Sequence, residues 1–395
     1  MKPALRSEVE SAFRRRYSRD AEAVAFAPGR VEILGNHTDY NGGFVMPVGL
    51  DLGVAAAGGR RPGRRVEIHT ATLGESIEFD LDRIERHPAL RWADYPKGVL
   101  RELIASDVPV EGFSLAIASD LPFGAGVSSS AALELAVAEA CYGLFGGRPK
   151  DLMGEALLCQ RAEADFVGMP CGLLDQFASA FAEENCALFL DCATREWRRL
   201  PVGRSDLALV LADTRVKHAL VDGKYAELRR SCERAAARLG EGLGRAVRSL
   251  REVTIDEFVR LRGTLPAEDA RRAEHVLREN ERVLEGKARL EAGEPELLGP
   301  LMVASHGSSR DFFGNSCTEL DVLVEEAQRL PGFIGGKLSG GGFGGCTVNL
   351  IEAAAAQDFS RALANRYRAR TGSEPRMIRA GIGGGARVER SPKGR

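Results

Sequence analysis

The feature that most constrains this chain is a glycine- and serine-rich loop, residues 124–132, between two segments of different periodicity. The alternating apolar run from Phe113 to Ala118 predicts a strand before the loop. The segment from Leu133 onward is rich in alanine and leucine and predicts a helix, which we expect to begin at about Ser129. The sequence therefore predicts strand, loop and helix in direct succession.

Such a loop is suited to binding phosphate. Gly124 and Gly126 let backbone N–H groups approach an anion, and the helix directs its positive end to the same point. Ser128, Ser129 and Ser130 add hydroxyl donors and a possible metal ligand. The loop lacks both the Gly-Lys-[Ser/Thr] of the common P-loop and the Gly-x-Gly-x-x-Gly dinucleotide spacing. The alternative interpretation is a tight turn with a serine helix cap.

Length and charge limit the class of protein. A chain of 395 residues exceeds the usual size of a single core, so two domains are expected. The 54 basic and 56 acidic residues nearly balance, which argues against nucleic acid or a membrane surface as a partner. No apolar run is long enough to span a bilayer, and the N-terminus lacks the apolar core of a signal peptide. The eight cysteines have no CxxC spacing and indicate buried thiols in a reducing, cytoplasmic setting.

A second stretch, residues 27–44, combines a strand with a loop rich in hydrogen-bonding groups. Arg30 lies in the predicted strand, and Asn36, His37 and Asp39 follow within ten positions. The glycines at 42 and 43 let the chain pass close to another group. Each hydroxyl of a sugar both donates and accepts, so such a set is suited to a polyol. The alternative is a set of Asx turns with a histidine that only satisfies the loop.

Three further positions have two interpretations each. Trp92 is either a core residue or a platform for a purine base. Asp175, at the start of a predicted helix, is either a helix-terminal partner or a catalytic carboxylate. The glycines around Lys337 and Ser339 either wrap a phosphate or let two domains touch. We place the domain boundary in the charged stretch 195–205, with domains at 1–200 and 201–376 and a last strand at about 377–388 that rejoins the first domain.

These motifs, in this order, resemble the superfamily of galactokinase, homoserine kinase, mevalonate kinase and phosphomevalonate kinase. The stretch from Pro28 to Gly43 is similar to the sugar motif of galactokinases, and the loops at 124–132 and 339–345 are similar to the shared ATP-phosphate motifs. Residues 171–177, Glu163, Val216-Lys217-His218, Tyr225 and the segments 305–306 and 317–321 also fit. The resemblance implies an α/β (α+β) protein: an N-terminal α/β domain with a Gly-Ser phosphate loop, a ferredoxin-like C-terminal domain, and an active site between them.

Site roles follow from the resemblance, residue by residue. It implies that Asp175 is the catalytic carboxylate beside the C1 hydroxyl of the sugar and that Arg30 pairs with it. It implies ATP as cosubstrate, with Trp92 near the adenine and the loop Gly124, Gly126, Ser128, Ser129 and Ser130 around the phosphates. Ser130 and Glu163 would hold Mg²⁺. The implied sugar contacts are Asn36, His37, Asp39, Gly172 and Tyr225. These roles suit phosphoryl transfer, which depends on positioning and charge neutralisation.

One departure concerns the sugar itself. Galactokinases usually have glutamate where this chain has Asn36, and that glutamate resembles a partner for the C6 hydroxyl. Asparagine both donates and accepts, and its lack of charge would not repel a C6 carboxylate. We therefore expect a D-galactose kinase, with a sugar that differs at C6 (galacturonate, a 6-deoxy sugar or L-arabinose) as the alternative. Acidic residues often precede the Ser-Cys at 316–317, where this chain has Phe312 to Asn315.

Two other function classes are weighed against a sugar kinase. A non-catalytic sensor of sugar and ATP would have lost catalytic residues, yet Arg30, Ser130, Glu163 and Asp175 are all present. A homoserine or mevalonate kinase is disfavoured by the loop at 37–40, which suits a polyol. We expect a monomer whose partners are a small-molecule sugar and ATP, with neither nucleic acid nor membrane.

Overall fold

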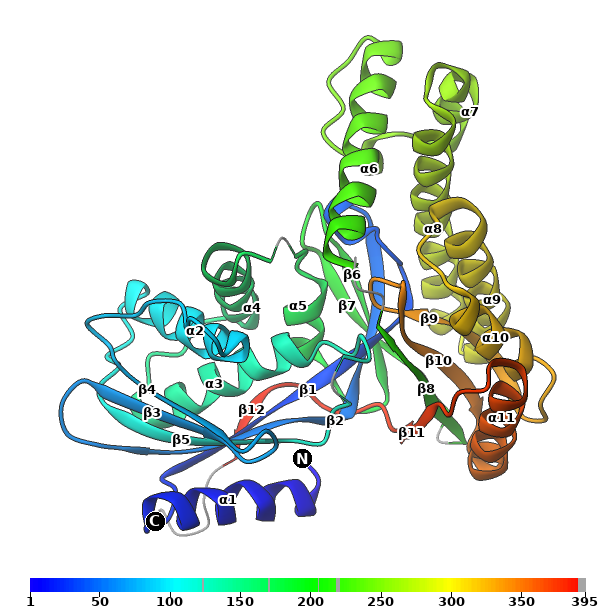
Figure 1. Cartoon of the computed structure of the whole chain (residues 1–395). Coiled ribbons are helices and arrows are strands. Elements are labelled where there is room, and N and C mark those ends of the chain that lie inside the picture. Colours follow the sequence, from blue (N-terminus) through cyan, green and yellow to red (C-terminus); the bar gives the residue numbers. More distant parts are fainter. Residues whose placement is uncertain (123, 170, 205, 218–220, 390–395) are drawn as a thin grey trace.

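The computed structural model describes residues 1–122, 124–169, 171–204, 206–217 and 221–389. His218, part of one motif named above, lies outside these ranges. Two sheets lie side by side, each covered by helices, and a group of long helices projects beyond the second sheet (Figure 1). No helix in the described ranges is long and apolar enough to cross a membrane.

The first sheet has eight strands in the order β12-β1-β2-β5-β3-β4, and β6 pairs with both β2 and β7. Its pairs are antiparallel except that of β3 with β5. The strands are β1 (Ala23–Leu34), β2 (Phe44–Arg60), β3 (Arg65–Thr70), β4 (Glu75–Asp80), β5 (Phe113–Ser119), β6 (Cys186–Asp191), β7 (Trp197–Pro201) and β12 (Arg387–Glu389). Strands β1 and β2 are buried over almost their whole length because helices cover both faces.

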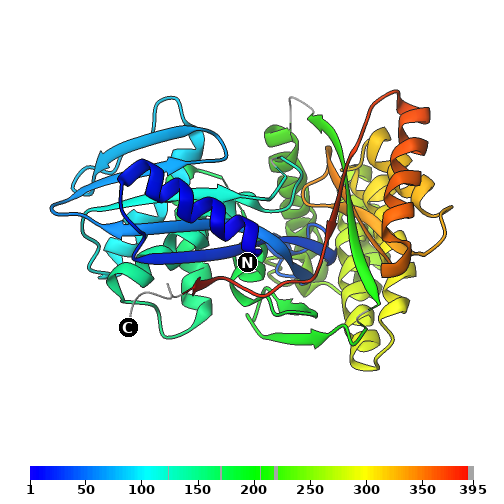
Figure 2. The same cartoon turned by 90° about the horizontal axis from the view of Figure 1, so that it is seen from below.

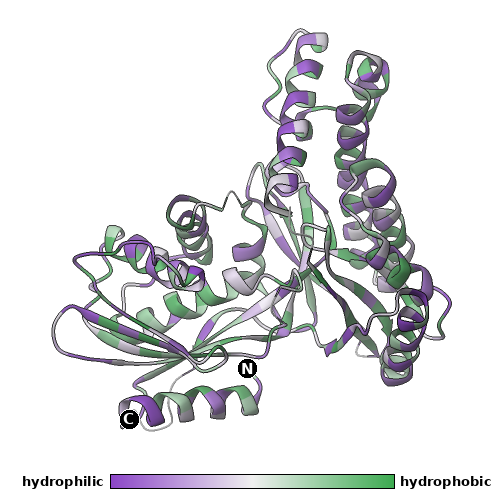
Figure 3. Ribbon diagram, viewed as in Figure 1, coloured by the Kyte–Doolittle hydropathy of each residue, from purple (hydrophilic) through white to green (hydrophobic). Residues whose placement is uncertain are grey.

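The helices of this half lie on opposite faces of the sheet. Helix α1 packs through Val9 and Phe13 on one face, and four helices cover the other (Figure 1). The helices are α1 (Pro3–Tyr17), α2 (Asp94–Ala105), α3 (Ser129–Phe145), α4 (Leu152–Arg161) and α5 (Leu174–Phe181). Helix α3 is apolar on nearly all sides because it lies between the sheet and the other helices (Figure 3). A π-helical turn, Ala162–Val167, continues α4 and carries Glu163.

The second sheet has four antiparallel strands in the order β11-β8-β10-β9. With strands numbered along the chain this order is 4-1-3-2, and helices lie in both crossovers, which is the ferredoxin-like arrangement expected. The strands are β8 (Leu207–Lys217), β9 (Phe333–Ser339), β10 (Gly344–Glu352) and β11 (Arg376–Ala380). Helices α10 (Thr318–Ala327) and α11 (Ala356–Thr371) cover one face, and α9 (Leu298–Ser308) packs against β9.

Helices α6 (Val221–Leu243), α7 (Ile255–Leu261) and α8 (Ala267–Glu291) project from the second half around a small core of their own (Figure 1). Helix α8 also packs on the ends of β1 and β2. A Cβ added to Gly286 would lie 2.7 Å from Leu34 Cδ1, which leaves no room for a larger residue. The C-terminal half of α8 therefore packs against the last residue of β1, directly before the loop that joins β1 to β2.

The structure refines two limits placed from the sequence. Strand β7 pairs with β6 within the charged stretch 195–205, so a boundary placed after residue 200 falls inside a strand, and the second sheet begins with β8 at Leu207. The strand expected at 377–388 is two strands: β11 belongs to the second sheet and β12 pairs with β1. Between them the chain crosses back along the first sheet, where Ile382 bridges to Leu50 (Figure 2).

Candidate active site

The centre of the candidate site is an ion pair between Arg30 of β1 and Asp175 of α5. Arg30 Nε and Nη2 donate to Asp175 Oδ1 at 2.8 and 2.6 Å, and Nη1 donates to the carbonyl of Gly126 at 2.8 Å. The register of β1 against β2 shifts between Pro28 and Arg30, an irregularity of the kind that re-aims a side chain. Gly29 lets the strand reach the phosphate loop, since a Cβ there would lie 2.7 Å from the Val127 carbonyl oxygen.

The predicted phosphate loop lies against this pair. Gly124 and Gly126 both have φ of 72°, in the left-handed region that glycine favours, and Ser128 reaches it too at 55°. The Ser128 hydroxyl donates to Asp175 Oδ2 and does not cap α3. The simple interpretation of a serine cap is therefore wrong for Ser128. Ser129 and Ser130 begin α3, where backbone N–H groups are free of helical partners.

A pocket of about 180 Å³ opens beside the start of α3. Its wall is mainly apolar, with Trp92 and Tyr95 on one side and Ser129 and Ser130 at the other. The indole N–H of Trp92 donates to the Glu75 carboxylate, which fixes the ring at the pocket. The structure thus brings Trp92 and the loop serines to one cavity.

A group of carboxylates lies behind Ser130. The Ser130 hydroxyl and the Cys171 thiol hydrogen-bond Glu163, and Gln176 Nε2 bridges Glu163 and Glu134 at 2.6 and 2.9 Å. Burial, and then the charge of Asp175, raise the pKa of Glu163. Burial and the charges of Glu163 and Asp175 raise the pKa of Glu134 well above its usual value. Among the described residues, neither glutamate forms an ion pair with a cation.

The β1–β2 loop, residues 35–43, brings the predicted sugar contact Asp39 toward Asp175 and beside a second predicted contact, Gly172. Asp39 Oδ2 lies so close to Gly172 that a Cβ there would be 1.9 Å from it, which explains the glycine. Burial, with repulsion from Asp175 and Glu32, raises the pKa of Asp39 to about 6. Tyr225 of α6 lies at the same loop, with its ring centroid 5.3 Å from that of His37 and 5.8 Å from that of Tyr40. Burial and the charges of Asp39 and Asp175 raise the pKa of Tyr225.

His37, in contrast, has both ring nitrogens occupied by protein. Nε2 lies 3.2 Å from the Gly341 carbonyl, which only accepts, so Nε2 carries the proton and Nδ1 accepts from the Tyr40 hydroxyl at 2.9 Å. Burial lowers its pKa to about 3, so the ring is neutral. It packs against Phe313 and Tyr225, with ring centroids 4.6 and 5.3 Å away. Any contact of the ring with a sugar is therefore by packing.

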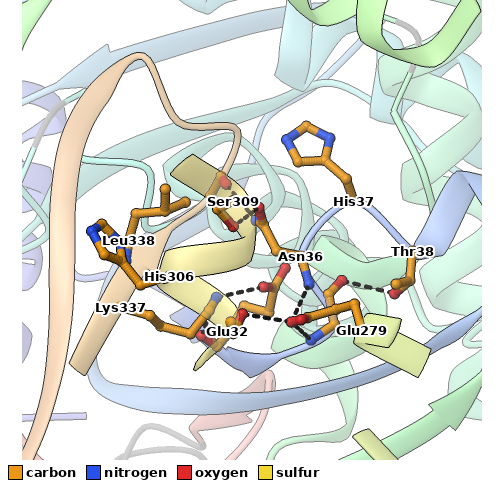
Figure 4. A network of polar contacts seen from close by, with 12 residues as sticks. Glu32, Asn36, His37, Thr38, Glu279, His306, Ser309, Lys337 and Leu338 are labelled. Carbon is orange, nitrogen blue, oxygen red and sulfur yellow. Dashed lines mark hydrogen bonds and ion pairs between the residues drawn. The ribbon is translucent and has the colours of Figure 1, made fainter. Parts of the chain in front are cut away.

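Asn36 is also largely committed to the protein. Its Oδ1 accepts from Ser309 Oγ at 3.2 Å and from Asn315 Nδ2 at 2.9 Å, and its Nδ2 donates to the Gly340 carbonyl at 3.0 Å (Figure 4). The amide oxygen is used by two donors, so the second hydrogen of Nδ2 is the group left to offer. This orientation makes Asn36 a donor in the site.

Sequence reasoning missed a network of buried charges below the β1–β2 loop. Lys337 is fully buried and its Nζ lies 2.8 Å from Glu32 Oε1, so it does not face a phosphate (Figure 4). The late glycines instead allow contact: a Cβ on Gly126 would lie 3.0 Å from the Ser339 carbonyl oxygen. Glu279 of α8 is buried beside the loop as well. An acidic residue within the apolar strand β1 was the available signal for Glu32.

The similarity of this sequence to known protein families agrees with this geometry. Three family models match in the order of the motifs: the galactokinase galactose-binding signature at residues 11–60, the N-terminal domain of GHMP kinases at 94–183, and their C-terminal domain at 287–369. A galactokinase of Chloroflexus aggregans is 40% identical over 95% of this chain and 96% of its own length. Human galactokinase is 39% identical over 92% of each chain. The chain belongs to the galactokinase family.

The solved structures extend this assignment to the fold. The structure of Lactococcus lactis galactokinase complexed with galactose superposes with a TM-score of 0.89 at 32% identity, covering 95% of this chain and 98% of that one. The mevalonate kinase of Methanococcus jannaschii, at a TM-score of 0.62 and 16% identity, shares the fold alone. The expected two-domain GHMP kinase fold is confirmed, and this galactokinase-family chain is a sugar kinase. Arg30 and the β1–β2 loop fall in the first matched segment, and Asp175 falls in the second.

Proposed function

We propose that this galactokinase-family chain transfers the γ-phosphoryl group of ATP to the anomeric C1 hydroxyl of D-galactose. The observation that carries the proposal is Asp175, a single carboxylate oriented on one oxygen by Arg30 and on the other by the Ser128 hydroxyl. It lies where the phosphate loop and the β1–β2 loop meet, because Gly126 also accepts from Arg30. A kinase needs a proton acceptor at the junction of its two substrates.

In this proposal Asp175 accepts the proton of the C1 hydroxyl as the oxygen attacks the γ-phosphorus. Arg30 holds Asp175 and directs its positive charge at the transferring group, where negative charge must be stabilised. The N–H groups of the loop from Gly124 and the start of α3 bind the ATP phosphates. The pocket beside Trp92 takes the adenine, since its apolar wall and aromatic ring suit a base.

The residues present fit a magnesium ion at Ser130 and Glu163. Two buried carboxylates, Glu163 and Glu134, repel each other without a positive partner in the described part of the chain, and one oxygen of Glu134 is buried without a hydrogen bond. No group of three or more potential ligands occurs in the described residues. That suits Mg²⁺, which commonly uses one or two protein ligands plus substrate phosphates. When bound, the ion would neutralise the charge of the triphosphate.

For the sugar, Asp39 supplies an acceptor beside Gly172, and Tyr225, whose ring lies near His37, supplies a hydroxyl. His37 contributes packing through its ring. Asn36 offers an N–H donor and no charge, which favours tolerance at C6. A kinase for galacturonate, a 6-deoxy sugar or L-arabinose is therefore the second candidate. We also propose a monomer in the cytoplasm; all eight cysteines are free, as a reducing compartment predicts.

The decisive experiment measures Mg²⁺-dependent ATP consumption over D-galactose, D-galacturonate, D-fucose, L-arabinose, N-acetylgalactosamine and D-glucose. We expect D-galactose to give the highest kcat/KM. A faster reaction with galacturonate or a 6-deoxy sugar would transfer the assignment to the second candidate. Binding of sugar with no turnover of any sugar would contradict kinase activity and favour a sensor.

The variant Asp175→Asn tests the carrying observation. We expect ATP binding to persist and kcat to fall at least ~10²-fold, the lower range for loss of a general base. Asp269→Asn is a matched control, because Asp269 is a buried carboxylate that likewise accepts from an arginine, Arg234, and a serine, Ser231, but on α8. Near-normal turnover by Asp175→Asn would remove Asp175 from the mechanism.

A further inference from the structure

Three polar side chains of α8 contact both ends of the β1–β2 loop. His275, Glu279 and Asn280 are spaced i, i+4 and i+5, so they lie on one face of the helix. They are separated from the loop by more than 230 residues of sequence. All three are buried, which is unusual for charged or polar groups unless each has partners.

Glu279 holds the first end of the loop. Its Oε1 accepts from the backbone N–H groups of Gly35 and Asn36 at 2.9 and 3.2 Å (Figure 4). The same oxygen accepts from Ser305 Oγ at 2.7 Å, and Arg282 Nε donates to Oε2 at 2.6 Å. Glu279 is therefore an oriented carboxylate that satisfies two consecutive backbone donors of another part of the chain.

His275 and Asn280 complete the contact. His275 Nε2 donates to the Asn36 carbonyl at 3.0 Å, and its Nδ1 accepts from Ser308 Oγ at 2.9 Å. At the other end of the loop, Asn280 Oδ1 accepts from the Phe44 N–H at 2.9 Å. The fit is close, because a Cβ on Gly43 would lie 2.3 Å from that oxygen.

The loop needs such support because its own conformation is costly. His37 has φ of 60°, in the left-handed region that side chains other than glycine rarely adopt. Internal bonds, chiefly from Thr38 Oγ1 to the Gly35 and Phe44 carbonyls, close the turn but do not tie it to the rest of the molecule. His37 and Asp39, on either side of Thr38, face the site.

We propose that His275, Glu279 and Asn280 are positioning residues for sugar binding: α8 fixes the β1–β2 loop so that Asp39 stays beside Gly172 and Asp175. None of the three touches the reacting atoms. The identity of the sugar in this inference rests on the proposed function, whereas the contacts of α8 with the loop do not. Loss of the positioning residues would raise KM for the sugar and leave the phosphate loop and ATP binding unchanged.

The test is Glu279→Gln in the full chain, read by two methods. Hydrogen exchange of the free protein should show faster exchange at residues 35–44, by about 10-fold or more, the equivalent of one hydrogen bond to a charged group. Steady-state kinetics should show KM for D-galactose raised about 10-fold, with kcat and KM for ATP changed less than 2-fold.

Glu326→Gln is the matched control. Glu326 is also a buried carboxylate, on α10, and accepts from Arg329, Arg366 and Arg370. We expect it to lower stability without changing KM or the exchange of the loop. Equal loop exchange in wild type, Glu279→Gln and Glu326→Gln would overturn the proposal, whichever sugar is the substrate. Failure of the wild type to phosphorylate galactose would contradict the proposed function alone.

His275 supplies a second pair of variants if Glu279→Gln does not fold. His275→Leu removes the donor to the Asn36 carbonyl, whereas His275→Gln keeps an N–H at a similar distance from the backbone. We expect faster exchange of the loop in His275→Leu and near-wild-type exchange in His275→Gln. Unchanged exchange in both would refute the role of α8.

Discussion

Two groups of buried carboxylates on either side of the candidate site differ in their partners. Near the phosphate loop, Glu134 and Glu163 share one amide, Gln176, and no cation among the residues that the structure describes. Below the β1–β2 loop, Glu32 pairs with Lys337 at 2.8 Å and Glu279 with Arg282 at 2.6 Å. Both groups are buried to a similar degree, so burial does not distinguish them.

The pKa shifts of Glu279 and Glu163, one carboxylate from each group, have opposite signs. Burial alone would raise the pKa of Glu279, but Arg282, His275 and Lys337 together lower it to about 2. Its charge therefore stabilises the fold above the usual value of 4.5, and that contribution is lost as the pH falls toward 2. The raised pKa of Glu163 has the reverse effect: the fold loses stability as the pH rises from 4.5 through the raised value. Paired carboxylates support the structure, whereas unpaired ones suit a cation that arrives with the substrate.

Breaking an ion pair in the group below the β1–β2 loop should have the largest effect on stability. Lys337→Met leaves Glu32 buried without its cation, so we expect the free energy of unfolding to fall by about 3–5 kcal/mol. The double variant Glu32→Leu/Lys337→Met removes both charges and should recover most of this loss. Urea denaturation followed by circular dichroism measures both.

The control for this variant is Lys287→Met. Lys287 pairs with Glu291 one helical turn away on the surface of α8, and such pairs contribute about 0.3–0.5 kcal/mol. A loss below about 1 kcal/mol for Lys337→Met would mean that the Glu32 pair is not the support that its burial indicates.

Removing a charge from the group near the phosphate loop should change how the activity depends on magnesium. Glu163→Gln keeps the size of the side chain but lowers its affinity for a cation, so we expect the Mg²⁺ concentration for half-maximal activity to rise about 10- to 100-fold. Thermal stability without Mg²⁺ should not fall, because a neutral amide replaces a carboxylate with a raised pKa. Magnesium titrations of ATP consumption and melting curves give the two readouts.

Glu155→Gln is the comparison for this variant. Glu155 of α4 is buried and has neither carboxylate oxygen hydrogen-bonded, and the charged group that acts on it is Arg148, which follows the C-terminal end of α3. Its variant should leave the magnesium titration unchanged. Equal titrations for wild type and Glu163→Gln would exclude Glu163 as a metal ligand and leave Ser130 as the single proposed protein ligand.

Local sequence patterns and the family resemblance predicted much of the fold, and they pointed to the carboxylates near the phosphate loop through Glu163. The strand–loop–helix at 113–145 follows from periodicity, and the resemblance led to Arg30, Glu163 and Asp175 as site residues. Strand β7 was missed because its arginines and its proline are more typical of a charged loop than of a strand. The partners Glu32 with Lys337 and Glu279 with the loop were missed because helical or strand spacing gives no information on a contact about 240 to 300 residues away.

The smallest effect concerns Asp39, which lies between the two groups: Asp175 and Glu32 raise its pKa and Arg30 opposes them. With the pKa at about 6, kcat/KM for D-galactose should fall about fivefold from pH 6 to pH 5, because kcat/KM follows the free enzyme and the sugar hydroxyls need an ionised acceptor. At saturating galactose, kcat should vary less over this range. Asp39→Asn should give a lower but flat kcat/KM profile. A wild-type decline that begins only near the ordinary value of 3.8 would show that neither burial nor the neighbouring carboxylates raise the pKa of Asp39.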